Sequence, residues 1–168
     1  MDEAFKKDQE AKTADLMRRL GDVEQRLATH AAGPAPGGLT EPDPGATEQW
    51  QASQVWGHLA EFMPYWLDQL DKVISQYSGQ PVPFGRTKAD AARLQGIADG
   101  LGVPIADQMA SVREAIAMAR NYLAQLTPEQ WAAIGLHARR GEMGVPDIVR
   151  TFMLDHLEEH ASQLDTLV

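Results

Sequence analysis

Two histidines one helical turn apart, His156 and His160, have the type and the spacing that metal chemistry needs. Residues four apart on a helix lie on one face, so both imidazoles would point to the same place. An i, i+4 pair of histidines is a common way to present two nitrogen ligands to one metal ion. The pair also falls on an apolar stripe that should face a core, where an imidazole needs a hydrogen-bond or metal partner. The apolar members of this stripe are Val149, Met153, Leu164 and Leu167.

A third histidine, His58, precedes the pair by about a hundred residues and lies at the edge of another apolar helical stripe. Three histidines around one ion leave a position open for water or substrate, which is the arrangement of catalytic sites. Nitrogen ligands suit zinc, nickel, copper or iron, and the residues alone do not choose among these metals. The convergence of His58, His156 and His160 is therefore the site hypothesis, and a hydrogen-bonded core histidine is the alternative for each.

Four polar residues near these histidines are secondary candidates. Gln163 and Glu159 lie about 20° and 60° from His156 on a helical wheel, so they could contact the imidazoles from outside. A solvated helix flank is the alternative for both. His137 and Glu142 precede the last helix and could reach the mouth of a bundle, although an exposed turn position is the simpler interpretation. No general acid or base can be assigned.

Several other kinds of active site need residues that this sequence does not contain. His156 to His160 also fits the pattern H-x-x-E-H of inverted zinc proteases, but only eight residues follow His160 and a further ligand is needed downstream. Cysteine is absent, which excludes a thiolate nucleophile and a sulfur-ligated metal. The glycines of residues 33–38 lack the strand, helix and lysine of a phosphate-binding loop.

Composition favours a single domain spanning residues 1–168. The chain has 168 residues, 43% of them hydrophobic, which is enough for one core. Its formal net charge of −9 disfavours nucleic acid as a partner, and Arg139-Arg140 is too short a basic patch to change this. No apolar run approaches the ~20 residues that span a bilayer, so no membrane association is expected. Residues 1–7 are charged and lack a signal-peptide core, which predicts a cytoplasmic protein.

Hydrophobic periodicity predicts long helices over residues 2–30, 51–77, 103–126 and 145–168. Shorter helices are expected from Thr87 to about residue 100 and after Thr127. Residues 31–47 read as a flexible Pro/Gly-rich loop, and residues 136–143 as a tight turn or small hairpin before the last helix. The connection over residues 79–103 is long for a helix–helix turn and suggests a crossover between parallel helices. The fold class expected from these elements is all-α.

This order of motifs resembles the DinB-like (DinB/YfiT) family of metalloenzymes. The segment Trp50-Gln-Ala-Ser-Gln-Val-Trp-Gly-His58-Leu59 is similar to the W-x7-H-L motif that opens the second helix of the family. His156-Leu-Glu-Glu-His160 looks like the H-x3-H motif of its last helix. The resemblance covers nearly the whole chain. Gln51 departs from the Ser or Thr that often follows the tryptophan, which leaves the start of the second helix open.

The resemblance implies a four-helix bundle in up-down-down-up order that assembles as a homodimer. It implies a divalent metal, zinc or nickel, held by His58, His156 and His160. It also implies a small-molecule substrate and a reaction that activates a thiol or water, as in thiol-dependent transferases or isomerases and in hydrolases. A low-molecular-weight thiol would then be a second cofactor. The alternative is a non-catalytic dimer in which the metal or the histidines only join helices. Leu154, opposite the expected core stripe, is the candidate for the dimer contact.

Overall fold

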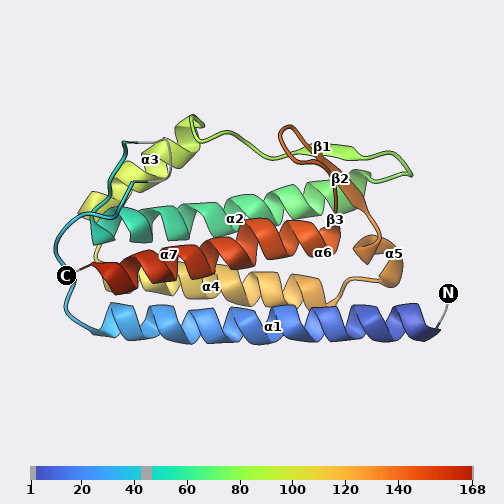
Figure 1. The fold of residues 1–168 in the computed structure, drawn as a ribbon, viewed down its shortest axis with the longest axis horizontal. Coiled ribbons are helices and arrows are strands. Elements are labelled where there is room, and N and C mark those ends of the chain that lie inside the picture. Colours follow the sequence, from blue (N-terminus) through green and yellow to red (C-terminus); the bar gives the residue numbers. More distant parts are fainter. Residues whose placement is uncertain (1–2, 43–46, 168) are drawn as a thin grey trace.

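The bundle is formed by three long helices and a C-terminal helical segment. The computed structural model describes residues 3–42 and 47–167. The long helices are α1 (Glu3–Ala32), α2 (Ala52–Gln76) and α4 (Ile105–Ala124). The C-terminal segment consists of α6 (Val145–Ile148), η2 (Val149–Leu154) and α7 (Asp155–Thr166). In Figure 1, α1 and the C-terminal segment run in one direction while α2 and α4 run in the other. The predicted up-down-down-up order is therefore confirmed.

Shorter elements make the connections between these helices. The crossover from α2 to α4 contains β1 (Val82–Phe84), α3 (Ala91–Asp99) and the 3-10 turn η1 (Gly100–Gly102). After α4 come α5 (Pro128–Trp131) and a hairpin of β2 (Ile134–His137) and β3 (Gly141–Gly144). This hairpin confirms the turn or hairpin expected before the last helix. The sequence did not predict β1, which pairs in parallel with β2 and turns the hairpin into a three-stranded sheet.

The helix starts show which capping signals operate. Gln51 is the N-cap of α2, and its side chain and that of Gln54 satisfy each other's backbone N–H groups, so the helix begins at Ala52. The cap of α3 is Asp90 rather than Thr87, because the Asp90 carboxylate accepts the backbone N–H of Arg93. The second helix and the crossover helix thus start one and four residues after the predicted positions.

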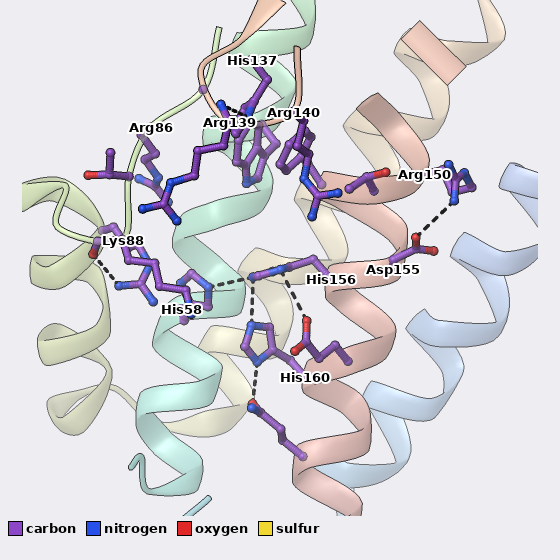
Figure 2. Close-up of a pocket in the computed structure, with 18 of the residues that line it drawn as sticks. His58, Arg86, Lys88, His137, Arg139, Arg140, Arg150, Asp155, His156 and His160 are labelled. Atoms are coloured by element: carbon purple, nitrogen blue, oxygen red, sulfur yellow. Dashed lines mark hydrogen bonds and ion pairs between the residues drawn. The ribbon is translucent and has the colours of Figure 1, made fainter. Parts of the chain in front are cut away.

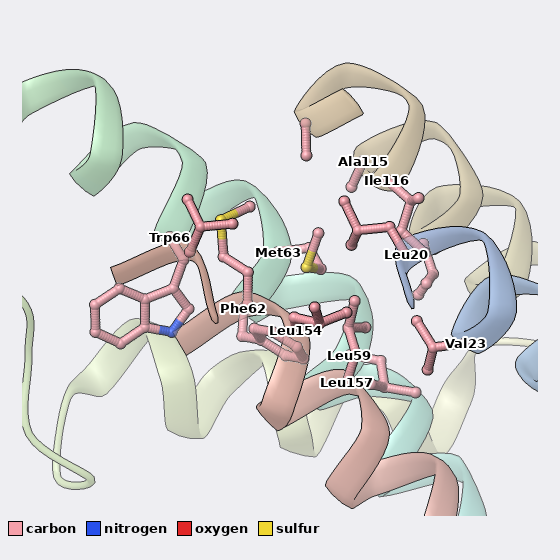
Figure 3. Packing of buried hydrophobic residues seen from close by; sticks show 14 of the residues in the cluster. Leu20, Val23, Leu59, Phe62, Met63, Trp66, Ala115, Ile116, Leu154 and Leu157 are labelled. Atoms are coloured by element: carbon pink, nitrogen blue, oxygen red, sulfur yellow. The ribbon is translucent and has the colours of Figure 1, made fainter. Parts of the chain in front are cut away.

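The apolar faces of the long helices meet in one core. Figure 3 shows side chains from α1, α2, α4, η2 and α7 packed together. Those labelled are Leu20, Val23, Leu59, Phe62, Met63, Trp66, Ala115, Ile116, Leu154 and Leu157. Burial of this apolar surface is the main force that holds the helices together. Across residues 3–42 and 47–167, no helix combines the length and apolar character needed to cross a bilayer.

The prediction that Leu154 lies on an outer face of the bundle is wrong. Leu154 is fully buried. It ends η2, a π-helical segment in which the N–H of Asp155 bonds to the carbonyl of Arg150, five residues earlier. A wheel drawn at 100° per residue does not hold through such a segment. The buried face is centred on Leu154, Leu157 and Ala161, which leaves the two histidines of α7 at its edge.

Two glycines let α2 and η1 approach each other backbone to backbone. A Cβ at Gly100 would lie 2.4 Å from the Ser53 carbonyl oxygen and 2.8 Å from the Cα of Gly57. Backbone atoms inside a helix cannot move aside as a flexible side chain would. Gly57 precedes His58, so this contact holds the crossover against the part of α2 that carries the first histidine.

We expect Gly100→Ala to lower the melting temperature because the new methyl group overlaps fixed backbone atoms. Overpacking of this kind costs about 1–3 kcal/mol. Gly102→Ala is the matched control: it lies in the same 3-10 turn, and its Cβ would meet no atom within 4 Å. Thermal unfolding by circular dichroism should separate the two variants. Identical melting temperatures for Gly100→Ala and Gly102→Ala would contradict this account of the crossover.

Candidate metal centre

Three imidazoles from two helices converge in one cluster. His58 comes from α2, and His156 and His160 come from α7 (Figure 2). The Nε2 atom of His156 lies 3.0 Å from the Nε2 atoms of both His58 and His160. His58 and His160 are buried, whereas the His156 side chain is 33% exposed. The structure thus brings together all three histidines of the site hypothesis.

Hydrogen bonds among the three rings cannot account for both short contacts of the His156 Nε2 atom. Each Nε2 atom carries either one proton or one lone pair, never both. The Nε2 of His156 can therefore make one ordinary hydrogen bond, yet it has two Nε2 neighbours at 3.0 Å. A cation placed among three lone pairs removes this conflict.

The outer nitrogen of each ring faces an oxygen. His160 Nδ1 lies 2.7 Å from Oε1 of Gln163, and His58 Nδ1 lies 3.4 Å from Oε2 of Glu61. His156 Nδ1 lies 3.8 Å from Oε2 of Glu159, a carboxylate that is 58% exposed. An acceptor beside Nδ1 favours the tautomer with its proton there, and the lone pair on Nε2 then points inward. Of the two flanking residues considered from the sequence, Gln163 makes a hydrogen bond and Glu159 approaches His156 without one.

The donor set fits a divalent ion. A tetrahedral zinc ion with nitrogens at about 2.0–2.1 Å places neighbouring nitrogens roughly 3.3 Å apart. The two separations from His156, 3.0 Å each, are close to this value, and the ligand atoms of all three histidines lie within 4.8 Å of one another. Among the described residues the cluster offers three histidines and no fourth protein ligand, which is the pattern of open sites.

Burial keeps two of these histidines neutral. It lowers the pKa of His58, and the nearby Glu61 carboxylate offsets this only in part. Burial also lowers the pKa of His156 well below its usual value, and the neighbouring His160 and His58 add to the shift. Neutral imidazole is the form that binds a metal, so the site favours the state required of its ligands.

Glu61 was not among the candidate residues identified from the sequence. Its side chain lies between His58 and Arg86, which forms an ion pair with it. Burial opposes ionisation of Glu61, but the contacts with His58 and Arg86 lower its pKa below the usual range. The i, i+3 spacing of His58 and Glu61 on α2 is the signal that could have identified this contact.

Trp50, the tryptophan of the W-x7-H-L motif, forms a wall of the site. Its ring stacks on His160 at 5.9 Å between centroids and meets the edge of His58 at 5.3 Å. The hydroxyl of Thr40 accepts the backbone N–H of Trp50, and the N–H of Thr40 donates to the Trp50 carbonyl oxygen. Thr40 belongs to the Pro/Gly-rich loop, whose residues 43–46 lie outside the described part of the chain.

The histidines form the floor of a cavity of about 850 Å³, which is the size of a small-molecule site. His137 lines this cavity from β2, so it does reach the mouth of the bundle. Glu142 is exposed and does not line the cavity, which agrees with the simpler interpretation of it as an exposed turn residue. One wall of the cavity is aromatic and consists of Trp66, Phe84, His137 and Phe152.

Comparisons with known proteins agree with this architecture. A family model for the DinB superfamily matches residues 8–164. The structure of mycothiol-dependent maleylpyruvate isomerase superposes with a TM-score of 0.65 and 14% identity over 95% of this chain, and a mutant of that isomerase gives 0.66. This chain spans only 61% of the isomerase's length.

A second similar fold is YfiT from Bacillus subtilis, described as a probable metal-dependent hydrolase with an unusual four-helix bundle topology. Its TM-score is 0.65 and its identity 17%, over 91% of this chain and 85% of YfiT. At such identities the likeness shows the fold alone. No curated protein matches the chain significantly.

Proposed function

The chain belongs to the DinB superfamily, and we propose that it is a metal-dependent enzyme whose ion is held by His58, His156 and His160. The observation that carries the proposal is the orientation of the three rings, with each Nδ1 toward an oxygen and the Nε2 atoms toward one point. Zinc and nickel are the proposed metals because the resemblance to the DinB-like family implies them, and three nitrogen ligands are compatible with both.

A divalent ion at this point would act as a Lewis acid that makes a thiol or water more nucleophilic at neutral pH. The residues of the chain would supply the rest. Gln163 and Glu61 would hold the rings of His160 and His58 in the required tautomer and orientation. Trp50 would shield the buried side of the site, and the partly exposed His156 would face the substrate.

The similar folds suggest which reactions such an enzyme would catalyse. The related folds include a mycothiol-dependent isomerase and a described hydrolase. We therefore propose either transfer or isomerisation that uses a low-molecular-weight thiol, or hydrolysis, on a small-molecule substrate. A purely structural ion that joins α2 to α7 is less well supported, because structural sites are usually closed by four protein ligands. The described residues of this cluster supply three.

An assay with two reactions tests this proposal. We expect the zinc- or nickel-loaded protein to accelerate either thiol conjugation to chlorodinitrobenzene or hydrolysis of p-nitrophenyl acetate. Candidate thiols are mycothiol, bacillithiol and cysteine. Activity should disappear after chelation, return on addition of metal, and be absent from His156→Ala. Rates that are equal in the loaded parent, the chelated parent and His156→Ala would rule out an enzymatic role in both reactions.

Assembly is a separate prediction that rests on the family resemblance alone, because the buried Leu154 cannot make the proposed dimer contact. We propose a homodimer in a cytoplasmic setting, without nucleic acid or membrane as partner. Sedimentation at micromolar concentration would decide the oligomeric state.

A further inference from the structure

Cationic side chains are concentrated around the cavity of an otherwise acidic protein. Among the described residues, six lysines and arginines line it but only four acidic residues do. The cations are Arg86, Lys88, Arg93, Arg139, Arg140 and Arg150, and the acids are Glu41, Glu48, Asp155 and Glu159. A cleft lined by an excess of one charge attracts ligands of the opposite charge. A bound divalent ion would increase this excess.

The six cations differ in what already neutralises them. Arg86 forms ion pairs with Glu61 and Asp90, and Arg150 forms them with Asp147 and Asp155. Among the described residues, no carboxylate lies within ion-pair distance of Arg139 or Arg140. The guanidinium groups of Arg139 and Arg140 therefore have unused capacity for an anion.

The hairpin places these two arginines over the metal centre. Arg139 and Arg140 occupy its tip, between the paired residues His137 and Gly141. Gly141 has a φ of 75°, which closes this short turn without strain. The backbone N–H of Arg139 donates to Nδ1 of His137 at 3.3 Å. Figure 2 shows both side chains extending from the hairpin toward the level of His58 and His156.

An apolar wall stands beside these cations. The guanidinium of Arg140 lies 5.7 Å from the ring centre of Phe152, which itself stacks on Trp66 at 4.3 Å. Phe84 and His137 contact the same Phe152 ring. A guanidinium held over an aromatic ring keeps its hydrogen-bonding edge free for a planar anion. The cavity thus has three parts: the candidate metal centre, an aromatic wall and a cationic rim.

We propose that the substrate is a small organic carboxylate, whose carboxylate binds Arg139 and Arg140. The rest of the molecule lies along the aromatic wall and directs its reactive end to the three histidines. The guanidinium groups of these two arginines can donate hydrogen bonds to the two oxygens of one carboxylate. This inference rests on the proposed function for the reaction at the metal, whereas the binding of the anion can be measured without metal.

Calorimetric titration of the full chain with cinnamate tests the inference, and cinnamamide serves as the neutral analogue of the same shape. Both are added to metal-free and zinc-loaded parent protein. The test variant is Arg139→Gln/Arg140→Gln. The matched control is Arg18→Gln/Arg113→Gln, which makes the same change in net charge at exposed residues outside the cavity.

We expect cinnamate to bind metal-free parent protein at least roughly tenfold more tightly than cinnamamide, because charge-assisted hydrogen bonds stabilise the anion. Arg139→Gln/Arg140→Gln should lose this preference, and the control should keep it. Undetectable binding of cinnamate at millimolar concentration, or equal affinity for the two ligands, would overturn the inference. An unchanged preference in Arg139→Gln/Arg140→Gln would also overturn it.

Two further outcomes separate this inference from the proposed function. Cinnamate that binds only zinc-loaded protein, and binds Arg139→Gln/Arg140→Gln equally well, would place the carboxylate at the metal. The inference would then be wrong and the proposed function would stand. Protein that binds no zinc but keeps the preference for cinnamate through Arg139 and Arg140 would support the anion site and contradict the metal site.

Discussion

Zinc is expected to raise the melting temperature of the metal-free protein by roughly 5–10 °C at pH 8, when free zinc is about a hundred times its dissociation constant. The ion stabilises the folded chain because only the folded chain brings His58, His156 and His160 together. The measurement is a pair of melting curves, with chelator and with buffered free zinc, repeated from pH 8 to pH 4.5. An unchanged melting temperature at pH 8, in protein shown to bind zinc, would mean that the ion is not coupled to folding.

The dependence on pH follows from the lowered pKa values of two histidines. Without metal, the unfolded chain takes up protons near the ordinary histidine pKa of 6.5, while the folded His58 and His156 remain neutral. The free energy of unfolding therefore falls as the pH drops below 6.5. His58 and His156 each contribute at most about 1.4 kcal/mol per pH unit.

The rise in melting temperature caused by zinc should depend on pH in a different way. It depends on protons that compete with the metal in the folded state, and the lowered pKa values of His58 and His156 move the competition at these two ligands below pH 6.5. The difference between the two melting curves should therefore persist at pH 6 and shrink only at lower pH. Carboxylates that titrate in both samples cancel in this difference. An increment already halved at pH 7 would contradict the assigned directions of the pKa shifts.

Much of the fold could be predicted because the long helices keep regular apolar spacing and clear boundaries. Val112, Ile116 and Leu123 are buried on one face of the helix predicted over residues 103–126, and Thr127 caps α5. The last helix was predicted less well, since the π-helical segment shifts the face on which Leu154 lies. Nothing in the local sequence of η2 signals the wider turn.

The histidines were identifiable, but most of their surroundings were not. His156 and His160 are related by a helical repeat, which sequence spacing reveals directly. The parallel pairing of β1 with β2 joins segments some fifty residues apart, and no local pattern encodes that contact. Arg139 and Arg140, which looked like a short basic patch, gain their significance only because this sheet fixes the hairpin over the cavity.

Loss of a single histidine should have the largest effect on metal affinity. Changing an outer partner of a metal ligand typically weakens affinity 10- to 100-fold, so removing the ligand itself should weaken it by more than about 100-fold. We expect this for His160→Ala and for His156→Ala. His156→Ala should disturb folding less, because the His156 side chain that it removes is partly exposed. Gln163→Leu, which removes the acceptor for His160 Nδ1, should show the intermediate loss.

Zinc titration against a competing chelator, with elemental analysis of the same samples, tests the metal centre most directly. His137→Ala is the matched control, since His137 lines the same cavity but lies outside the cluster. The parent and His137→Ala should bind one zinc ion per chain with equal affinity, and His156→Ala and His160→Ala should each bind it more than about 100-fold more weakly. Stoichiometric zinc of unchanged affinity in folded His156→Ala and His160→Ala would contradict the three-histidine site.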